Sequence, residues 1–419
     1  MPDHRPPPPH PLDRHPLDPD RTVPALLVKV GHYPEHPGGL GVIRTLGRLG
    51  VPVYAMVEHP RTPAAVSRYL TRAFVRPSTG LEDPAELVER IRETGRAIGR
   101  PAVAVATDDE GAVLLAEHAE ALADRFLLPP VPPALPRELA SKAGLYRLCV
   151  RHGVPTPRAL APGSRDELLA TARDWGYPVV LKNLEAWTRL RHPVVGHTTV
   201  VPDEAALRAL LPPDGRPSVL LQEYLPAERC EDWISHLWIG SDGGAGAAPD
   251  TVFTGRKVRS WPPYSGVTTR ARAESNPELA ALALGFCHAI GYRGVADLDW
   301  RRDLRDGRYL LVDFNPRTGA QFRAFETVDG VDVVRALHLG LTGRPVPPGP
   351  QLERGFAVGQ LDLPSALVSA WHERRIPADL RPRLSTERSW LARDDPAPAA
   401  AEVFWFGAAV GRRLRRALG

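Results

Sequence analysis

Residues 310–319 read LLVDFNPRTG, and this short stretch decides how the rest of the chain is interpreted. The run begins as an apolar strand, yet it carries Asp313, a residue type that strands usually avoid. Side chains on a strand alternate between its faces, so Asp313 and Asn315 project from one face. The preceding run, GVADLDW at 294–300, is a second apolar strand with acidic side chains, among them Asp299. The pattern predicts a hairpin that carries acidic side chains on one face.

Carboxylates gathered in this way need a compensating charge. If the two strands pair, Asp299 lies beside Asp313, and neighbouring carboxylates repel unless they are protonated or bridged by a cation. Two carboxylates and an amide oxygen are hard ligands that suit Mg²⁺, which takes its remaining ligands from water and substrate phosphates. We therefore expect Asp299, Asp313 and Asn315 to hold Mg²⁺, or Mn²⁺ in its place. The alternative is that these residues end a strand and contact solvent.

The run LLVDFNPRTG resembles the last-strand signature of the ATP-grasp superfamily, which is usually written Glu-x-Asn-Pro-Arg. Asp299 falls where that family has its other acidic metal ligand. The resemblance implies that the metal ions bridge the phosphates of ATP, and that Arg317 contacts the transferred phosphoryl group or an acyl-phosphate. Asp313 replaces the usual Glu, so a shorter side chain must reach the metal.

Two lysines fit the same resemblance. Lys142 opens a predicted helix after a proline-rich segment, and Lys182 ends the apolar strand YPVVLKN at 177–183. In the family, lysines at these two places bind the phosphates of ATP, and the second also lies near the adenine. A lysine that ends an apolar strand needs an anionic partner or a route to water, so contact with solvent is the alternative for Lys182. Lys142 taken alone is most often a solvated helix residue.

The run SVLLQEYLP at 218–226 resembles the hinge strand between the two halves of an ATP-grasp fold. Downstream, Asp232 is the preferred candidate for the ribose hydroxyls because it directly precedes the predicted strand at 233–240. A surface charge cluster is the alternative there. The resemblance also implies that four hinge residues border the adenine, where main-chain groups usually read the base: Gln222, Glu223, Tyr224 and Leu225.

The glycine-rich loop that covers the phosphates in many ATP-grasp enzymes has no counterpart here, since residues 184–200 contain only Gly196. Such loops supply backbone donors to phosphate oxygens. We expect other side chains to take that place. The candidates, among which the sequence does not choose, are Thr188, Arg189 and His197.

A basic segment, GRKVRSWPPYSGVTTRAR at 255–272, precedes the hairpin as substrate-side loops do in the D-aspartate-ligase-like branch of the family. Arg matches carboxylate and phosphate with two parallel hydrogen bonds. One or two of the basic residues are therefore candidates to hold an acidic substrate or the γ-phosphate, and Lys257 is assigned to the nucleotide. The alternative is a solvated basic strand. The basic residues are Arg256, Lys257, Arg259, Arg270 and Arg272.

The expected fold class is α/β and α+β, with a Rossmann-like domain followed by a two-part ATP-grasp fold. Alternating strand and helix patterns predict a parallel sheet in the first domain. Gly38, Gly39 and Gly41 lie in the first expected loop, but their spacing is not that of a dinucleotide motif. Asp108 and Asp109 follow a later strand and are candidates to contact a substrate, but helix capping explains them more simply.

The expected organisation has six segments. Prolines remove backbone donors, so the proline-rich run before the lid is predicted to be a linker without regular structure. The segments are a disordered Pro/His-rich leader at 1–22, the Rossmann-like domain at 23–128, the linker at 129–141, the ATP-grasp lid at 142–226, the metal-bearing subdomain at 227–345, and a C-terminal extension at 346–419 with a basic terminal helix.

The composition excludes several classes of protein. The 419 residues carry a formal net charge of +4, and the basic residues are spread along the chain, which gives no support for a nucleic-acid partner. Cys149, Cys230 and Cys287 are far apart and show no metal-ligand spacing, so we expect a reducing compartment without disulfides. The N-terminus lacks the apolar core of a signal peptide, and no apolar run approaches the roughly 18 residues of a membrane span. We therefore expect a cytoplasmic protein.

The C-terminal run VFWFGAAVGRRLRRALG at 403–419 has two interpretations. A basic amphipathic helix of this kind can bind a membrane surface or a partner. Packing against the body, or disorder, is favoured over membrane contact. The sequence leaves the oligomeric state open, a homodimer included.

The resemblance implies an enzyme, an ADP-forming ligase that joins a carboxylate to an amine through an acyl-phosphate. The expected partners are a small-molecule amine and a small-molecule carboxylate, for which the branch suggests an amino acid or a short peptide. The expected catalytic residues are Lys142, Lys182 and Arg317, since they would offset charge on the transferred phosphoryl group. The alternatives are an ATP-grasp enzyme of other chemistry, such as a kinase or thiol ligase, a nucleotide-binding protein without catalysis, and a membrane-associated scaffold.

Overall fold

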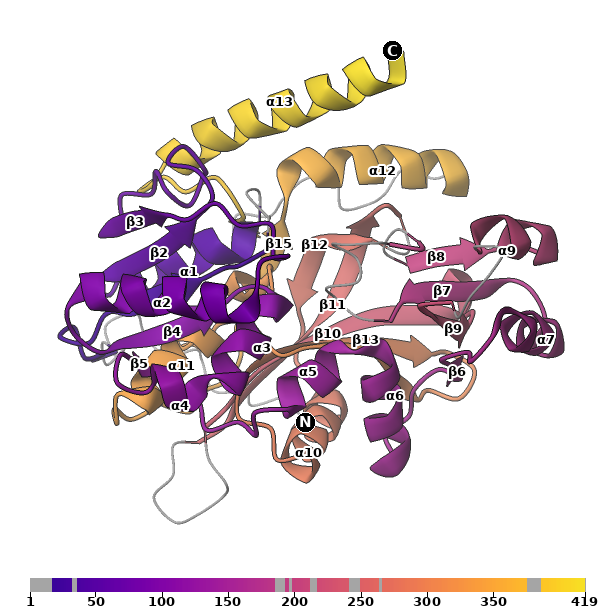
Figure 1. The fold of residues 1–419 in the computed structure, drawn as a ribbon, viewed down its shortest axis with the longest axis horizontal. Coiled ribbons are helices and arrows are strands. Elements are labelled where there is room, and N and C mark those ends of the chain that lie inside the picture. Colours follow the sequence, from indigo (N-terminus) through magenta and orange to yellow (C-terminus); the bar gives the residue numbers. More distant parts are fainter. Residues whose placement is uncertain are drawn as a thin grey trace, which may run out of the picture.

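The computed structural model describes most of the chain, as three sheets flanked by helices. In Figure 1 the sheet of the N-terminal domain lies at left and the sheet of the expected lid lies at right. Strands of the third sheet, which carries the predicted hairpin, lie between them. The predicted α/β and α+β fold class is confirmed. The candidates for the loop after Lys182, and the first 16 residues of the leader, lie outside the described residues. The described residues are 17–31, 36–184, 193–195, 198–211, 217–240, 249–263, 266–374 and 386–418.

The first sheet has five strands in the order β3-β2-β1-β4-β5, and its strand pairs are parallel. Strands β1 and β4 are buried apolar runs, as expected in a parallel sheet covered on both faces. The strand order reverses between β1 and β4, the place where such sheets commonly bind ligands. The elements are β1 (Ala25–Val28), α1 (Pro37–Gly47), β2 (Val53–Val57), β3 (Arg72–Val75), α2 (Pro84–Ile98), β4 (Ala102–Ala106), α3 (Asp109–Glu117), α4 (Ala119–Leu122) and β5 (Phe126–Leu127).

Gly38, Gly39 and Gly41 do not lie in a loop, as the sequence led us to expect, but belong to α1. Pro37 begins this helix, at a position where its missing N–H costs nothing. The absent side chains let α1 approach a later segment closely, since a Cβ atom on Gly41 would lie 2.7 Å from the ring of Phe322. Close packing, rather than a turn, explains this glycine.

The second sheet, which belongs to the expected lid, is antiparallel with the order β6-β9-β7-β8. Helix α5 corrects the expectation that residues 129–141 lack regular structure. Pro136 stands in the first turn of α5, where a missing N–H breaks no helical hydrogen bond. The elements are α5 (Leu135–Ala140), α6 (Lys142–Arg151), β6 (Ala159–Leu160), α7 (Arg165–Trp175), β7 (Val179–Asn183), β8 (Thr198–Val201), α9 (Glu204–Leu210) and β9 (Val219–Glu223).

The third sheet has seven strands in the order β14-β13-β10-β11-β12-β15-β16. Its neighbouring strands are antiparallel, except that β15 and β16 are parallel. One face packs against α10 in a core that includes Leu298, Trp300 and Phe314. The elements are β10 (Cys230–Ile239), β11 (Thr251–Trp261), β12 (Val267–Ala273), α10 (Pro277–Ala289), β13 (Gly294–Asp303), β14 (Tyr309–Asn315), α11 (Val333–Leu341), β15 (Gly355–Ala357), α12 (Gly359–Glu373), β16 (Thr386–Arg388) and α13 (Ala397–Leu418).

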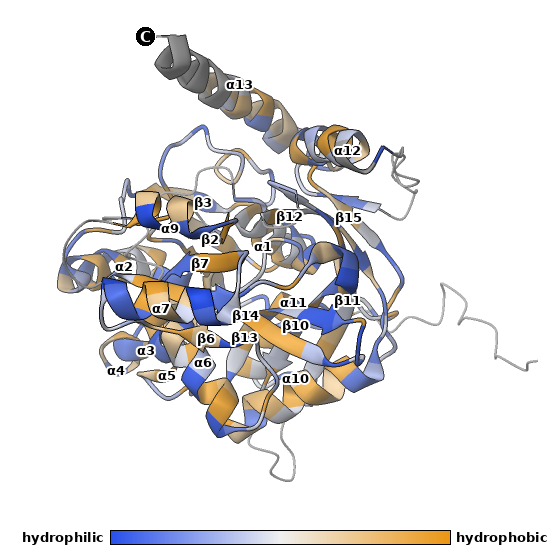
Figure 2. Cartoon of the chain, turned by 90° about the vertical axis from the view of Figure 1, so that its right-hand side faces the viewer, coloured by the Kyte–Doolittle hydropathy of each residue, from blue (hydrophilic) through white to orange (hydrophobic). Residues whose placement is uncertain are grey.

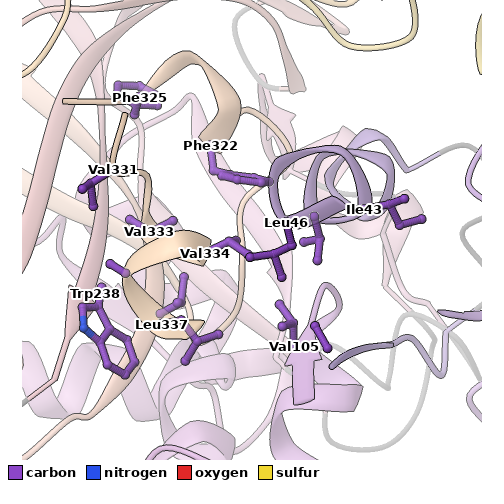
Figure 3. Packing of buried hydrophobic residues seen from close by; sticks show 14 of the residues in the cluster. Ile43, Leu46, Val105, Trp238, Phe322, Phe325, Val331, Val333, Val334 and Leu337 are labelled. Carbon is purple, nitrogen blue, oxygen red and sulfur yellow. The ribbon is translucent and has the colours of Figure 1, made fainter. Parts of the chain in front are cut away.

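A shared hydrophobic core joins the first sheet to the third sheet (Figure 3). Ile43 and Leu46 of α1 and Val105 of β4 belong to one cluster with Leu337 of α11 and Trp238 of β10. Each of these side chains is at most 3% exposed. Burial of apolar area contributes roughly 25 cal/mol per Å², so this core fixes the first domain against the sheet that carries the predicted metal ligands.

The expected boundary before residue 346 implied a separate C-terminal extension, but the C-terminal segment is part of the third sheet. It completes the third sheet through β15 and β16. It also holds the first domain, because the guanidinium of Arg44 on α1 is buried and donates to the carboxylate of Asp395 at 3.0 Å. A buried arginine requires such a partner. The segment therefore helps to set how the first and third sheets lie together.

Helix α13 lies beside α12 at the edge of the molecule (Figure 2). Gln360 of α12 donates to Glu402 of α13 at 2.6 Å, and the indole of Trp405 donates to the carbonyl of Arg61 at 2.8 Å. Phe404 is 65% exposed, so the helix contacts the body on one side only within its described part. In the part of the chain that the structure describes, no helix is both long and apolar enough to cross a membrane.

Candidate active site

Asp299 lies directly opposite Asp313 in the antiparallel pair of β13 and β14, and Asp297 lies opposite Asn315. Opposite residues in such a pair point from the same face of the sheet, with Cβ atoms about 5 Å apart. The predicted hairpin is therefore confirmed. It gathers Asp299, Asp313 and Asn315 on one face.

A β-bulge decides which side chains of β14 reach this face. The register shifts between Asp299 and Trp300, so that Leu311 pairs with Trp300 and Val312 is the extra residue. On a regular strand, side chains three positions apart point to opposite faces. Because of the bulge, Leu311 and Phe314 instead both lie in the core against α10. The aspartate between them is left on the polar face.

Both predicted lysines reach the hairpin. The ammonium of Lys142 forms an ion pair with the carboxylate of Asp313, and that of Lys182 donates to the carbonyl of Val312 at 3.3 Å. Burial lowers the pKa of Lys182 to about 8, and the nearby charge of Lys142 acts in the same direction. Burial alone would raise the pKa of Asp313, but the charges of Lys142 and Lys182 outweigh it and lower that pKa to about 2. The carboxylate is therefore ionised at neutral pH.

Lys257 pairs with the other carboxylate of the hairpin. It reaches Asp299 from β11, two strands away, with Nζ 2.9 Å from Oδ1. Burial would lower the pKa of Lys257, but the charges of Asp299 and Asp232 outweigh it and raise the pKa. Each of the two opposing carboxylates is thus balanced by a lysine, which removes the repulsion that two bare carboxylates would have.

The arginines of the segment 255–272 pair with protein carboxylates away from the hairpin, whereas one or two of them were expected to serve the substrate. Residues 255–261 and 267–272 of this segment lie in strands β11 and β12 rather than in a loop. Arg259 and Arg270 both donate to the carboxylate of Asp362 in the first turn of α12, at 2.8 and 2.9 Å. Within the described part of the segment, only Lys257 reaches the hairpin carboxylates. The other ion pairs of the segment are Arg256–Glu231 and Arg272–Glu274.

Arg317 lies between two carboxylates, one on strand β13 of the third sheet and one on helix α3 of the first domain. Its Nη1 lies 2.9 Å from Oδ2 of Asp297 on β13, and its Nε lies 3.3 Å from Oδ1 of Asp109 at the start of α3. Burial alone would lower the pKa of Arg317, but the two carboxylates hold it above its usual value. The first domain therefore contacts the predicted phosphoryl-binding arginine.

The contact of Asp109 with Arg317 was missed from the sequence. Asp108 performs the capping that both aspartates were expected to perform, because its Oδ1 accepts from the amide of Gly111 at 3.0 Å. Its Oδ2 accepts from the amide of Val30 at 2.8 Å. One side chain suffices to cap a helix. The presence of a second aspartate in the sequence was therefore the feature that could have indicated another role for Asp109.

His236 is another polar residue that was missed. It lies opposite Asp297 on β10, fully buried, with its Nδ1 3.4 Å from Oδ1 of Asp297. Burial lowers the pKa of His236 to about 3, so the ring is neutral at physiological pH. Gly319 closes over both side chains, since a Cβ atom there would clash with the ring of His236. The available signal was a histidine inside the apolar run WISHLWIG.

An arginine ties the hinge to the strand of the metal hairpin. The carbonyl of Leu225 accepts from Nη1 of Arg301 at 3.0 Å, and Asp232 accepts from Nε and Nη2 of the same guanidinium at 2.8 and 3.2 Å. Asp232 and Arg301 are opposite each other on β10 and β13. Arg301 lies two positions from Asp299 along β13, which is a step of about 7 Å on the same face of the sheet.

A pocket of about 310 Å³ lies at the hinge. Glu223, Tyr224 and Leu225 line it, together with lid residues such as Trp175 and Tyr177. The fourth predicted hinge residue is buried in β9 and is not part of this lining. Lys142, Lys182, Asp299 and Asp313 also lie outside it. Three of the residues predicted to border the adenine therefore line one pocket, and this pocket is separate from the cluster of lysines and carboxylates on the hairpin.

The candidate metal ligands offer two carboxylates and one amide. Asn315 donates through Nδ2 to the carbonyl of Asp297 at 3.1 Å, so its side-chain oxygen is the atom left to face a cation. Among the described residues, no three His, Cys, Asp or Glu side chains gather as a metal-binding group. A Mg²⁺ ion here would need water and phosphate oxygens to complete its shell, which is its usual mode in nucleotide sites. The donor set therefore fits magnesium bound together with a nucleotide.

No family model matches the chain. It is similar to a D-aspartate ligase of Enterococcus faecium, with 22% identity over 251 residues that cover 55% of this chain and 56% of the ligase. It is also similar to a biotin carboxylase of Pseudomonas aeruginosa, with 28% identity over 212 residues that cover 48% of this chain and 45% of the carboxylase. The chain matches only about half the length of each of these curated relatives.

Among solved structures, the chain is similar to the biotin carboxylase domain of the 2-oxoglutarate carboxylase from Hydrogenobacter thermophilus. The TM-score is 0.53 at 18% identity, over 78% of this chain and 70% of that chain. Identity this low shows the fold alone. The chain therefore shares the fold of that domain, in agreement with the ATP-grasp fold that the sequence predicted. The curated relatives to which the chain is similar are a ligase and a carboxylase.

Proposed function

We propose that this chain is an enzyme, an ADP-forming ligase that uses ATP and Mg²⁺ to join a carboxylate to an amine through an acyl-phosphate. One observation carries the proposal: Lys142 and Lys182 meet the hairpin on which Asp299 faces Asp313. Phosphoryl transfer from a nucleotide needs both cations that hold phosphates and carboxylates that hold the metal. The similarity to proteins named D-aspartate ligase and biotin carboxylase supports the same class.

In this proposal the nucleotide lies between the lid sheet and the third sheet. The adenine faces the hinge strand at Gln222 and the three hinge residues that follow it. The ribose hydroxyls face Asp232, which Arg301 keeps in place. The step of about 7 Å along β13 from that pair to Asp299 suits the distance from a ribose to its phosphates.

The phosphates are proposed to recruit the lysines that now balance the carboxylates. Asp299, Asp313 and Asn315 would hold Mg²⁺, which when bound supplies positive charge against the phosphate oxygens. Lys142 and Lys257 would then turn from their carboxylates to those oxygens.

The reaction is proposed to have two steps. A carboxylate oxygen of the first substrate attacks the γ-phosphorus of ATP, the bond to the β-phosphate oxygen breaks, and ADP leaves. Lys142, Lys182 and Arg317 offset the charge that spreads over the transferred group. The amine then attacks the acyl carbon and phosphate leaves. A closed lid protects the acyl-phosphate from water.

The similar proteins indicate which acids to test first. The D-aspartate ligase relative favours an amino acid or a short peptide as the acid. The solved carboxylase domain contains MgADP and bicarbonate and is a dimer, so bicarbonate belongs among the acids to be tested and a homodimer is the expected assembly. The three cysteines are unpaired, in agreement with a proposed cytoplasmic location. Contact of α13 with a membrane is the minor alternative.

A matrix of acids and amines tests the proposal. The full chain is incubated with ATP, Mg²⁺ and each acid–amine pair, with ADP and phosphate release and product masses as the readouts. We expect stoichiometric ADP and phosphate, and a product mass equal to acid plus amine minus water, for at least one pair. A phosphorylated alcohol formed without an amine would identify a kinase instead. Tight binding of Mg·ATP without ADP release for every pair would identify a protein without catalysis.

A further inference from the structure

The first domain reaches the Asn-Pro-Arg loop of the third sheet through the junction between β4 and α3. The amide of Thr318 donates to the carbonyl of Ala106, the last residue of β4, at 3.2 Å. The side chain of Arg317 pairs with Asp109, the first residue of α3, at 3.3 Å. A main-chain contact and a side-chain contact therefore join the two domains beside the proposed reaction centre.

The guanidinium of Arg317 is held on two of its three sides. Its Nη1 donates to Asp297 at 2.9 Å and to the carbonyl of Thr318 at 3.3 Å, and its Nε forms an ion pair with Oδ1 of Asp109 at 3.3 Å, without hydrogen-bond geometry. Within the described residues, Nη2 has no hydrogen-bond partner. Because the donors of a guanidinium lie in one fixed plane, carboxylates at Nη1 and Nε determine where Nη2 points.

Asp109 is itself held by a rigid support. The preceding residue, Asp108, binds the amides of Val30, Gly31 and Gly111 at 2.6 to 3.0 Å, which fixes the start of α3 to the end of β1. The side chains of Asp109 and Arg317 are each only 16% exposed. Preorganised contacts of this kind place a group without a further entropy cost during the reaction.

We propose that Asp109 is a positioning residue for the ligase reaction: it acts through Arg317, by fixing the guanidinium so that Nη2 meets the transferred phosphoryl group or the acyl-phosphate. This inference rests on the proposed function. The contacts at Nη1 alone leave the guanidinium free to turn about that atom, whereas a second carboxylate, from helix α3 of the first domain, removes that freedom. The domain that precedes the two ATP-grasp halves thus contributes a residue that acts on the reaction through Arg317.

The first test compares Asp109→Asn with a matched control. We expect kcat to fall about 10- to 100-fold, as for a small misplacement of a reacting group, while KM for ATP stays within about twofold. Glu86→Gln removes a carboxylate from the first turn of α2 in the same domain, where it pairs with Arg90 on the surface, and should leave kcat unchanged. Asp109→Glu keeps the charge with a longer arm and should give an intermediate kcat. Unchanged kcat in Asp109→Asn would overturn the proposal.

A double-mutant cycle separates positioning from direct substrate binding. If Asp109 acts through the arginine, Asp109→Asn should change the residual kcat of Arg317→Lys by less than about twofold, because residues that act as a unit are not additive. If the two losses multiply, Asp109 acts on the substrate independently of Arg317, and the proposal is wrong.

A third measurement does not require turnover. The ¹⁵Nε–¹Hε NMR signal of Arg317, assigned by its loss in Arg317→Lys, should shift and exchange faster with solvent in Asp109→Asn but not in Glu86→Gln. An unchanged signal in folded Asp109→Asn would overturn the positioning role whether or not a substrate pair is known. If the signal shifts but the protein turns over no acid–amine pair, the contact between Asp109 and Arg317 is supported and the proposed ligase function is wrong.

Discussion

Lys142 and Asp313 stand 171 positions apart in the chain, yet their side chains form an ion pair. Lys142 opens α6, and Asp313 lies on the edge strand of the third sheet. Their side chains are 21% and 27% exposed, and ion pairs with such access to water contribute little to stability. We therefore attribute the pair to the site rather than to the fold: a nucleotide would take the lysine, and a metal ion would take the carboxylate.

Lys182 predicts a pH dependence of nucleotide binding. Burial lowers the pKa of Lys182 to about 8, so its ammonium loses a proton, and its attraction for phosphate, as the pH rises through 8. We expect the Kd for MgADP to rise by up to about tenfold per pH unit above 8, the limit for one linked proton. Calorimetric titrations from pH 7 to 9.5 measure this. Lys182→Arg stays charged and should give a flatter profile, and identical profiles would rule out this role.

His236 predicts a loss of stability in mild acid. Burial lowers the pKa of His236 from 6.5 to about 3. A histidine with a lowered pKa in the folded state binds protons preferentially in the unfolded state, so its contribution is complete above about pH 6.5 and is lost as the pH falls toward 3. Between pH 6.5 and 5 the loss is up to about 2 kcal/mol.

Urea unfolding at pH 7 and pH 5 checks this expectation. His236→Gln keeps a polar group without a titrating ring, so its free energy of unfolding should fall by about 2 kcal/mol less than that of the wild type over this interval. Equal losses in the two proteins would mean that His236 does not titrate as its burial indicates.

Asp362 is predicted to serve stability and not substrate binding. The side chains of its partners Arg259 and Arg270 are 7% and 11% exposed, so Asp362→Ala removes the carboxylate that two nearly buried cations share. We expect the free energy of unfolding to fall by about 3–5 kcal/mol, with KM for ATP unchanged at low temperature. Glu274→Ala removes a more exposed partner, that of Arg272, and should cost less than about 1 kcal/mol. A raised KM in Asp362→Ala without loss of stability would return the two arginines to the substrate site.

The hairpin could be predicted because its evidence is local. Asp313 and Asn315 are two positions apart on one strand, and Asp299 lies one short turn upstream, where antiparallel pairing sets the register. Lys142 and Lys182 required the family resemblance, since nothing near them in the sequence places them beside Asp313. The bulge at Val312 could not be foreseen, because it depends on how both strands pack against α10.

Partners that lie far away along the chain could not be predicted. Arg259 and Arg270 were candidates to hold an acidic substrate or the γ-phosphate, whereas in the structure both donate to Asp362, 103 and 92 positions later. Helix capping was preferred over a substrate contact for Asp109 because a carboxylate at a helix start has that simpler role. Helix α5 was missed because its proline, Pro136, falls in the one turn that tolerates it.

ADP release by hairpin variants tests the proposed metal site most directly. The assay uses the acid–amine pair identified by the substrate matrix and compares Asp313→Ala and Asn315→Ala with Asp306→Ala. Asp306 lies in the exposed turn of the same hairpin and pairs with Arg308, so it controls for a lost carboxylate. We expect ADP release to fall about 100-fold or more in the first two variants, with thermal unfolding unchanged, and to stay within about twofold in Asp306→Ala. Wild-type rates in both Asp313→Ala and Asn315→Ala would contradict the proposal that this hairpin holds the metal and the phosphates.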